Sequence, residues 1–163
     1  MARKKRYSFP RVGDGRRSRV WSGITIFMAL LQIGLGEATN IYVKIPKVHP
    51  GSGANFASGA YPSFKWALSS TSMPLLQSHI VIGVLLFLAA LYTTIVVGDT
   101  KDNVAISLSV IGISTVIISA LYGVTFLQAQ ANTNAIVMAV GSLVTIATYL
   151  ALMIRAFGLR RSF

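Results

Sequence analysis

Four long apolar runs, separated by polar segments, set the pattern of this chain. The run from Ile80 to Val97 contains eighteen residues and no charge, which is long enough to cross the hydrocarbon core of a bilayer as a helix. The sequence therefore predicts an all-α, polytopic membrane protein in which four transmembrane helices form an antiparallel bundle. The predicted spans cover about residues 20–43, 75–97, 104–127 and 135–154.

The connections between the runs differ in length. Residues 98–103 and 128–134 are short polar turns, whereas residues 44–74 form one long loop. Within that loop, residues 61–68 mix aromatic side chains with Lys65, which predicts a short helix lying in the membrane interface over the bundle. Loops of this length are more often functional than idle, and a flexible loop without a role stays open as the alternative.

Composition supports the membrane prediction and narrows the chemistry. Charged residues make up 12% of the chain, against roughly 25% in soluble domains. The absence of cysteine excludes disulfides, thiolate metal sites, iron–sulfur clusters and covalent c-type haem attachment. The net charge of +11 comes mainly from basic clusters beside the spans. Such clusters are typical of cytoplasmic membrane anchors, so nucleic acid is not a predicted partner.

The distribution of Lys and Arg predicts the orientation in the cell membrane. Eight precede Trp21, one lies in the 98–103 turn and three follow Ile154, twelve in all, against three in the long loop. Because basic residues favour the cytoplasmic side, both termini are predicted to be cytoplasmic. Residues 1–19 are predicted to form a basic tail that has no regular structure or lies on anionic headgroups, and residues 20–157 a membrane domain. Residues 44–74 form an outer loop within that domain, and residues 158–163 form a basic C-terminal tail.

His79 is the main candidate for chemistry because it adjoins the second span. Neutral imidazole is a common ligand of metals and of haem iron. Gly83, four residues further on, lies on the same helical face and leaves room for a flat macrocycle. Glu37 is the only carboxylate in a predicted span, about 26 Å along the first helix at 1.5 Å per residue. This matched depth predicts a Glu37–His79 contact, and an interfacial histidine bonded to Glu37 or to a carbonyl is the alternative to a ligand.

Two stretches carry a resemblance to a known family. LLQIGLG at residues 30–36 and PLLQSHIVIGVLLFLAALY at residues 74–92, joined by the long loop, resemble one four-helix unit of the haem A synthase family over about residues 25–97. The resemblance implies a four-helix unit with His79 as axial ligand of the haem iron and haem b as the candidate cofactor. The chain departs from the family pattern at Leu76, Ile80 and Asn134, where the family has an acidic residue, an arginine and a second histidine.

These departures favour a derived haem-binding or accessory protein over haem A synthase activity. Two functions follow as alternatives. The first is a non-catalytic subunit of a larger membrane redox or transport complex, packed in the lipid bilayer against other membrane subunits or a second copy of itself. The second is a haem-binding membrane protein or enzyme related to haem A synthase. No P-loop, dinucleotide fingerprint, HExxH motif or nucleophile elbow is present to favour another enzyme class.

Overall fold

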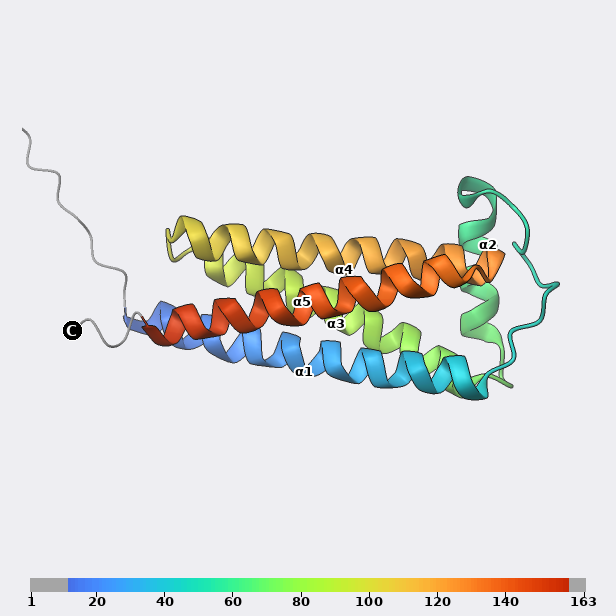
Figure 1. Cartoon of the computed structure of the whole chain (residues 1–163), viewed down its shortest axis with the longest axis horizontal. Helices are drawn as coiled ribbons and strands as arrows, with labels where there is room; N and C mark the ends of the chain where they lie inside the picture. The colour runs from blue at the N-terminus through green and yellow to red at the C-terminus, as the bar shows by residue number, and fades with distance from the viewer. Residues whose placement is uncertain (1–11, 159–163) are drawn as a thin grey trace, which may run out of the picture.

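The computed structural model describes residues 12–158, so the predictions for residues 1–11 and 159–163 lie outside the described part of the chain. Within that part, four long helices run along the molecule and a fifth, shorter helix crosses one end (Figure 1). The helices are α1 (Val12–Tyr42), α2 (Phe56–Ser69), α3 (Pro74–Gly98), α4 (Asn103–Ala129) and α5 (Asn132–Gly158). The predicted all-α fold is therefore confirmed.

The four long helices are each apolar and long enough to cross a membrane. They form a ring in which α1 packs on α3 and α5, and α4 packs on α3 and α5. We call the end crossed by α2 the loop end, and the opposite end, where α1 begins and α5 finishes, the termini end (Figure 1). The turn between α3 and α4 also lies at the termini end, as an antiparallel bundle requires.

The first helix begins earlier than the sequence predicts. Residues 12–19 were expected to belong to a tail without regular structure, but α1 already begins at Val12. In this part of α1, Arg19 Nε donates to the Gly15 carbonyl at 3.3 Å, and the Arg19 guanidinium lies 4.7 Å from the centre of the Phe157 ring. Arginine is a good helix former, and a cation over an aromatic face adds stability.

Polar residues at the helix ends lengthen the other spans by a few residues. The Asp102 carboxylate caps α4 by accepting from the backbone N–H groups of Val104 and Ala105, at 3.1 and 3.3 Å. At its other end, α4 closes on Gln130, whose left-handed backbone (φ 49°) lets its N–H donate to the Phe126 carbonyl. The α4–α5 connection is therefore only residues 130–131, shorter than the predicted 128–134.

The centre of the bundle closes around Tyr149, which has no exposed surface. Its ring lies directly against the backbone of α4 at Gly112, where a Cβ atom would come within 2.6 Å of the ring. Hydroxyl pairs join the helices on either side: Thr25 with Thr93 at 3.0 Å and Thr115 with Thr145 at 2.8 Å. Small residues and interhelical hydroxyl bonds are the usual means by which helices associate in lipid.

Helix α2 lies across the loop end and confirms the predicted short helix, with wider bounds than residues 61–68, while its position in the membrane interface stays a prediction. The Asn55 side chain caps it by accepting from the Ser58 backbone N–H at 3.0 Å. Its buried residues are small and spaced four apart: Gly59, Ser63 and Ala67. This spacing places them on one face, so α2 can approach the ends of α3 and α4 closely. Together, residues 43–55 and α2 form what we call the cap.

Candidate functional site

His79 lies on the contact between α1 and α3, near the loop end. Its Nε2 accepts a hydrogen bond from the Gln32 side-chain amide at 3.2 Å. The edge of the imidazole ring packs on Gly36, where a Cβ atom would lie 3.1 Å from Cε1. Gln32 and Gly36 are one turn apart on α1, so both face α3. The small residue lets the ring approach α1, and the amide fixes its orientation.

The space that the haem hypothesis requires beside Gly83 is taken by Gln32. A Cβ atom at Gly83 would lie 3.1 Å from the Gln32 amide nitrogen. An iron ion on His79 Nε2 would have to displace this amide, so the residues in this packing do not fit a haem. Three buried polar atoms of α1 and α3 lack hydrogen-bond partners among the described residues: Gln32 Oε1, Thr39 Oγ1 and His79 Nδ1.

The described residues show no direct hydrogen bond between Glu37 and His79, so the predicted approach of the two side chains stays a prediction. Glu37 is exposed, whereas the histidine bonds to Gln32 and its other ring nitrogen has no partner in the described part of the chain. The reason is the helical repeat. At about 100° per residue, Glu37 lies roughly 140° around α1 from Gln32. Equal depth in the membrane therefore does not by itself make the two side chains direct hydrogen-bond partners.

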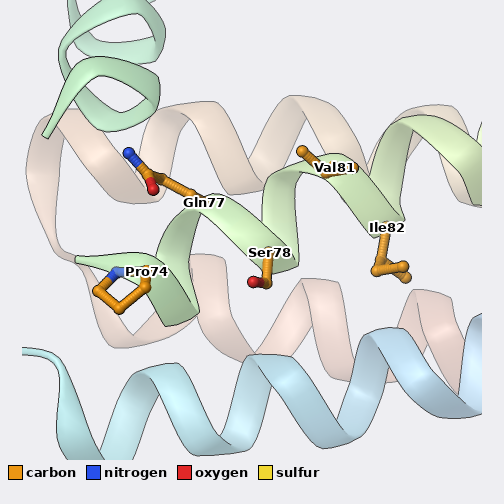
Figure 2. Close-up of a pocket in the computed structure, with 5 residues that line it drawn as sticks. All are labelled: Pro74, Gln77, Ser78, Val81 and Ile82. Atoms are coloured by element: carbon orange, nitrogen blue, oxygen red, sulfur yellow. The ribbon is translucent and has the colours of Figure 1, made fainter. Parts of the chain in front are cut away.

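A shallow depression on α3 contains none of the predicted site residues. It has a volume of about 330 Å³ and is lined by Pro74, Gln77, Ser78, Val81 and Ile82, all from one helix (Figure 2). Gln77 points toward the last turn of α2 (Figure 2), and its amide donates to the carbonyls of Leu68 and Ser70 at 2.8 and 3.0 Å. His79 and Gly83 lie on another side of α3, so this depression and the predicted site are separate.

His49, which sequence reasoning did not single out, is the more elaborately bonded histidine. It is 8% exposed, and its ring stacks on Trp66 of α2 with centroids 4.2 Å apart and planes 11° apart. Its Nε2 lies 2.9 Å from the Leu127 carbonyl at the end of α4, and its Nδ1 lies 3.0 Å from the Pro50 carbonyl. The available sequence signal was a histidine beside the turn-forming Pro50-Gly51, which alone does not indicate burial.

The surroundings of His49 tie the cap to the α4–α5 turn. The Gly53 N–H donates to the Gln128 carbonyl at 3.0 Å, and the Gln130 side chain donates to the Pro46 carbonyl, also at 3.0 Å. Gly51 and Gly53 have φ values of +87° and +70°, a region that glycine adopts at little cost. The long loop is therefore tied to the α4–α5 turn by specific hydrogen bonds.

At the termini end, Asp102 and Arg155 form a bidentate ion pair. Arg155 Nε lies 2.7 Å from Oδ2 and a terminal guanidinium nitrogen lies 2.9 Å from Oδ1. The hydrogen bond from Arg155 holds the pKa of the Asp102 carboxyl below its usual value, with the capped backbone N–H groups adding to the effect. This ion pair joins the α3–α4 turn to α5, and it gives Asp102, one of the few acidic residues, a structural role.

The four apolar helices and their hydroxyl-bonded interior define an integral membrane protein of the multi-pass, four-helix class. No group of three or more His, Cys, Asp or Glu side chains that could hold a metal ion occurs in residues 12–158. Comparisons with protein-family models, curated proteins and solved structures gave no match.

Proposed function

We propose that this chain is a non-catalytic subunit of a larger membrane complex of the redox or transport kind, and that a transmembrane helix of its partner packs on α4. The supporting observation is a stripe of exposed residues along α4. Its members alternate at spacings of four and three residues: Ser107, Ile111, Ser114, Ile118 and Leu121. This spacing is the heptad pattern by which two helices pack at a small left-handed angle.

Ser114 gives the stripe a polar group near mid-membrane depth. It lies eleven residues past the start of α4, or about 16 Å along a helix about 40 Å long. Lipid chains offer its hydroxyl no hydrogen-bond partner, whereas a neighbouring helix does. The adjacent Thr115 is already bonded inside the bundle to Thr145. The stripe is therefore better matched to a second helix than to lipid alone.

Site-specific photo-crosslinking tests the proposal, because the chain contains no cysteine. Ser114→Cys, coupled to a benzophenone maleimide in native membranes, is expected to give one discrete adduct that contains a component of a redox or transport complex. Leu143→Cys is the matched control, since Leu143 is also near mid-helix and is 62% exposed, but lies on α5. An adduct of twice the chain mass would assign the stripe to self-association instead. No adduct, or the same adduct from both variants, would overturn the assignment of α4.

The alternative function, haem binding at His79, is tested by an absorption spectrum of purified protein made with haem supplied during expression. We expect no Soret band, because Gln32 holds the ring nitrogen and occupies the space beside Gly83. A Soret band that disappears in His79→Ala would establish the histidine as axial ligand and favour the haem-binding alternative. A band that survives the substitution would show haem binding at another site.

A further inference from the structure

The exposed face of α2 carries a lysine between two large side chains. Tyr61 and Leu68 are 72% and 40% exposed, and Lys65 between them in the sequence is exposed as well. At about 100° per residue, these three positions lie roughly opposite Ser63, the central residue of the packed face. One face of α2 therefore packs on the rest of the chain, and the opposite face is uncovered within the described residues.

The level of α2 along the bundle follows from its neighbours. Ala67 of α2 packs in one cluster with Leu76 in the first turn of α3 and Leu127 in the last turn of α4. Leu76 lies sixteen residues from Tyr92, or about 24 Å along α3. The Tyr92 ring lies against Trp21 with centroids 4.3 Å apart. Because Trp and Tyr concentrate at membrane–water interfaces, this aromatic pair marks the boundary at the termini end.

This level decides what the exposed face of α2 meets. A hydrocarbon core about 30 Å thick, counted from the aromatic pair, reaches about 6 Å past α2. Helices that lie in the interface have their apolar face at such a depth, and a lysine stem can carry its ammonium group up to the headgroups. A membrane lipid therefore fits this face better than a water-soluble acidic protein, which would need α2 to stand clear of the bilayer.

The charge of the cap indicates which lipid fits. Residues 43–69 contain three lysines, all exposed, and no Asp or Glu: Lys44, Lys47 and Lys65. Ile45 packs against the same cluster as Ala67, so the two loop lysines beside it lie near the level of α2. Lysines at a membrane surface attract anionic headgroups, and no acidic side chain of the cap opposes this attraction.

We propose that the cap binds an anionic phospholipid of the leaflet at the loop end, and that Lys65 contacts its phosphate. Tyr61 and Leu68 lie against the upper part of the acyl chains, while the lysine ammonium extends to the headgroup. Lys44 and Lys47 add positive charge nearby. The proposal concerns the lipid around the chain, so it goes beyond the subunit function and does not depend on it.

Quenchers carried by lipids test the proposal on the full chain in phosphatidylcholine vesicles. Because the chain has no cysteine, Leu68→Cys takes a single nitrobenzoxadiazole label one turn from Lys65. Quenching by nitroxide-labelled phosphatidylglycerol is compared with quenching by equally labelled phosphatidylcholine. The anionic lipid is expected to associate about fivefold more strongly, as for one lysine near a membrane surface. Lys65→Gln should remove most of this preference, Lys65→Arg should keep it, and about 1 M salt should weaken it.

Arg16→Gln combined with Arg17→Gln is the matched control, because both arginines are exposed and lie at the termini end. This double variant removes two charges from the other leaflet and should leave the preference at Leu68 unchanged. Equal quenching by the two lipids, or a preference that survives Lys65→Gln, would overturn the proposal. Quenching of the label by aqueous iodide and by neither lipid would also overturn it, because α2 would then stand in water.

Discussion

The contact between Gly112 and Tyr149 makes a sharp prediction about packing in the bundle. A Cβ atom at Gly112 would lie 2.6 Å from Cε2 and 2.8 Å from Cζ of the tyrosine ring. The ring has no exposed surface and its hydroxyl faces the Ala90 carbonyl on α3, so it has no open space to move into. Gly112→Ala is therefore expected to force α4 and α5 apart.

A matched glycine isolates the steric part of this effect. Gly34 lies in a helix like Gly112, but nothing is within 4 Å of its Cβ position. Both alanine variants gain about 1 kcal/mol of helix propensity, whereas overpacking at Gly112 costs about 1–3 kcal/mol. Gly34→Ala should therefore raise the free energy of unfolding slightly. Gly112→Ala should lie below Gly34→Ala by about 1–3 kcal/mol.

Unfolding in mixed micelles of dodecyl maltoside and SDS, followed by far-ultraviolet circular dichroism, measures the difference between the two variants. Replacing Tyr149 with Leu in the Gly112→Ala background should recover part of the loss, since residues in contact do not behave additively. If the two alanine variants unfold at the same SDS fraction, or if Tyr149→Leu gives no recovery, the close contact between α4 and α5 is not as described here.

Two other predictions concern the ends of the bundle. Because the Asp102 pKa is lowered in the folded state, the ion pair with Arg155 stabilises the protein above the usual aspartate pKa and loses this effect as the pH falls through the folded value. Asp102→Asn, which keeps a capping side chain, should lower the free energy of unfolding by up to about 1 kcal/mol near pH 7 and by less near pH 3. An equal effect at both pH values would contradict the ion-pair account. Single cysteines at the exposed positions Lys47 and Lys101 should react with an impermeant maleimide from opposite sides of the membrane, Lys101→Cys from the cytoplasm, and labelling from one side would refute the predicted topology.

The membrane fold could be predicted from the sequence because it depends on local composition. Ile80–Val97 needs no partner to be identified as a span, since an uncharged run of this length has few other stable environments. The short helix α2 could likewise be predicted from the aromatic residues around Lys65. The early start of α1 was not predicted, because residues 12–19 have no apolar periodicity, and the contact of Arg19 with Phe157 joins positions far apart in the chain.

The candidate site shows where prediction from the sequence stopped. His79 was identified because a histidine beside an apolar span is unusual, and its depth pointed to Glu37. Its actual partner, Gln32, depends on which side of α1 faces α3, and apolar residues surround this helix too evenly to indicate that side. Gly83 was expected to leave space for a macrocycle, but Gln32 fills the space.

The four-span helical fold follows from the amino-acid sequence alone, because transfer of apolar residues from water to lipid is a property of each segment. Which polar groups meet depends instead on how the helices and the cap pack together. His49 illustrates this, because one ring nitrogen faces a neighbouring residue and the other faces Leu127, 78 positions away in the chain. A contact of that kind arises when the cap folds over the end of α4, and no local pattern of residues encodes it.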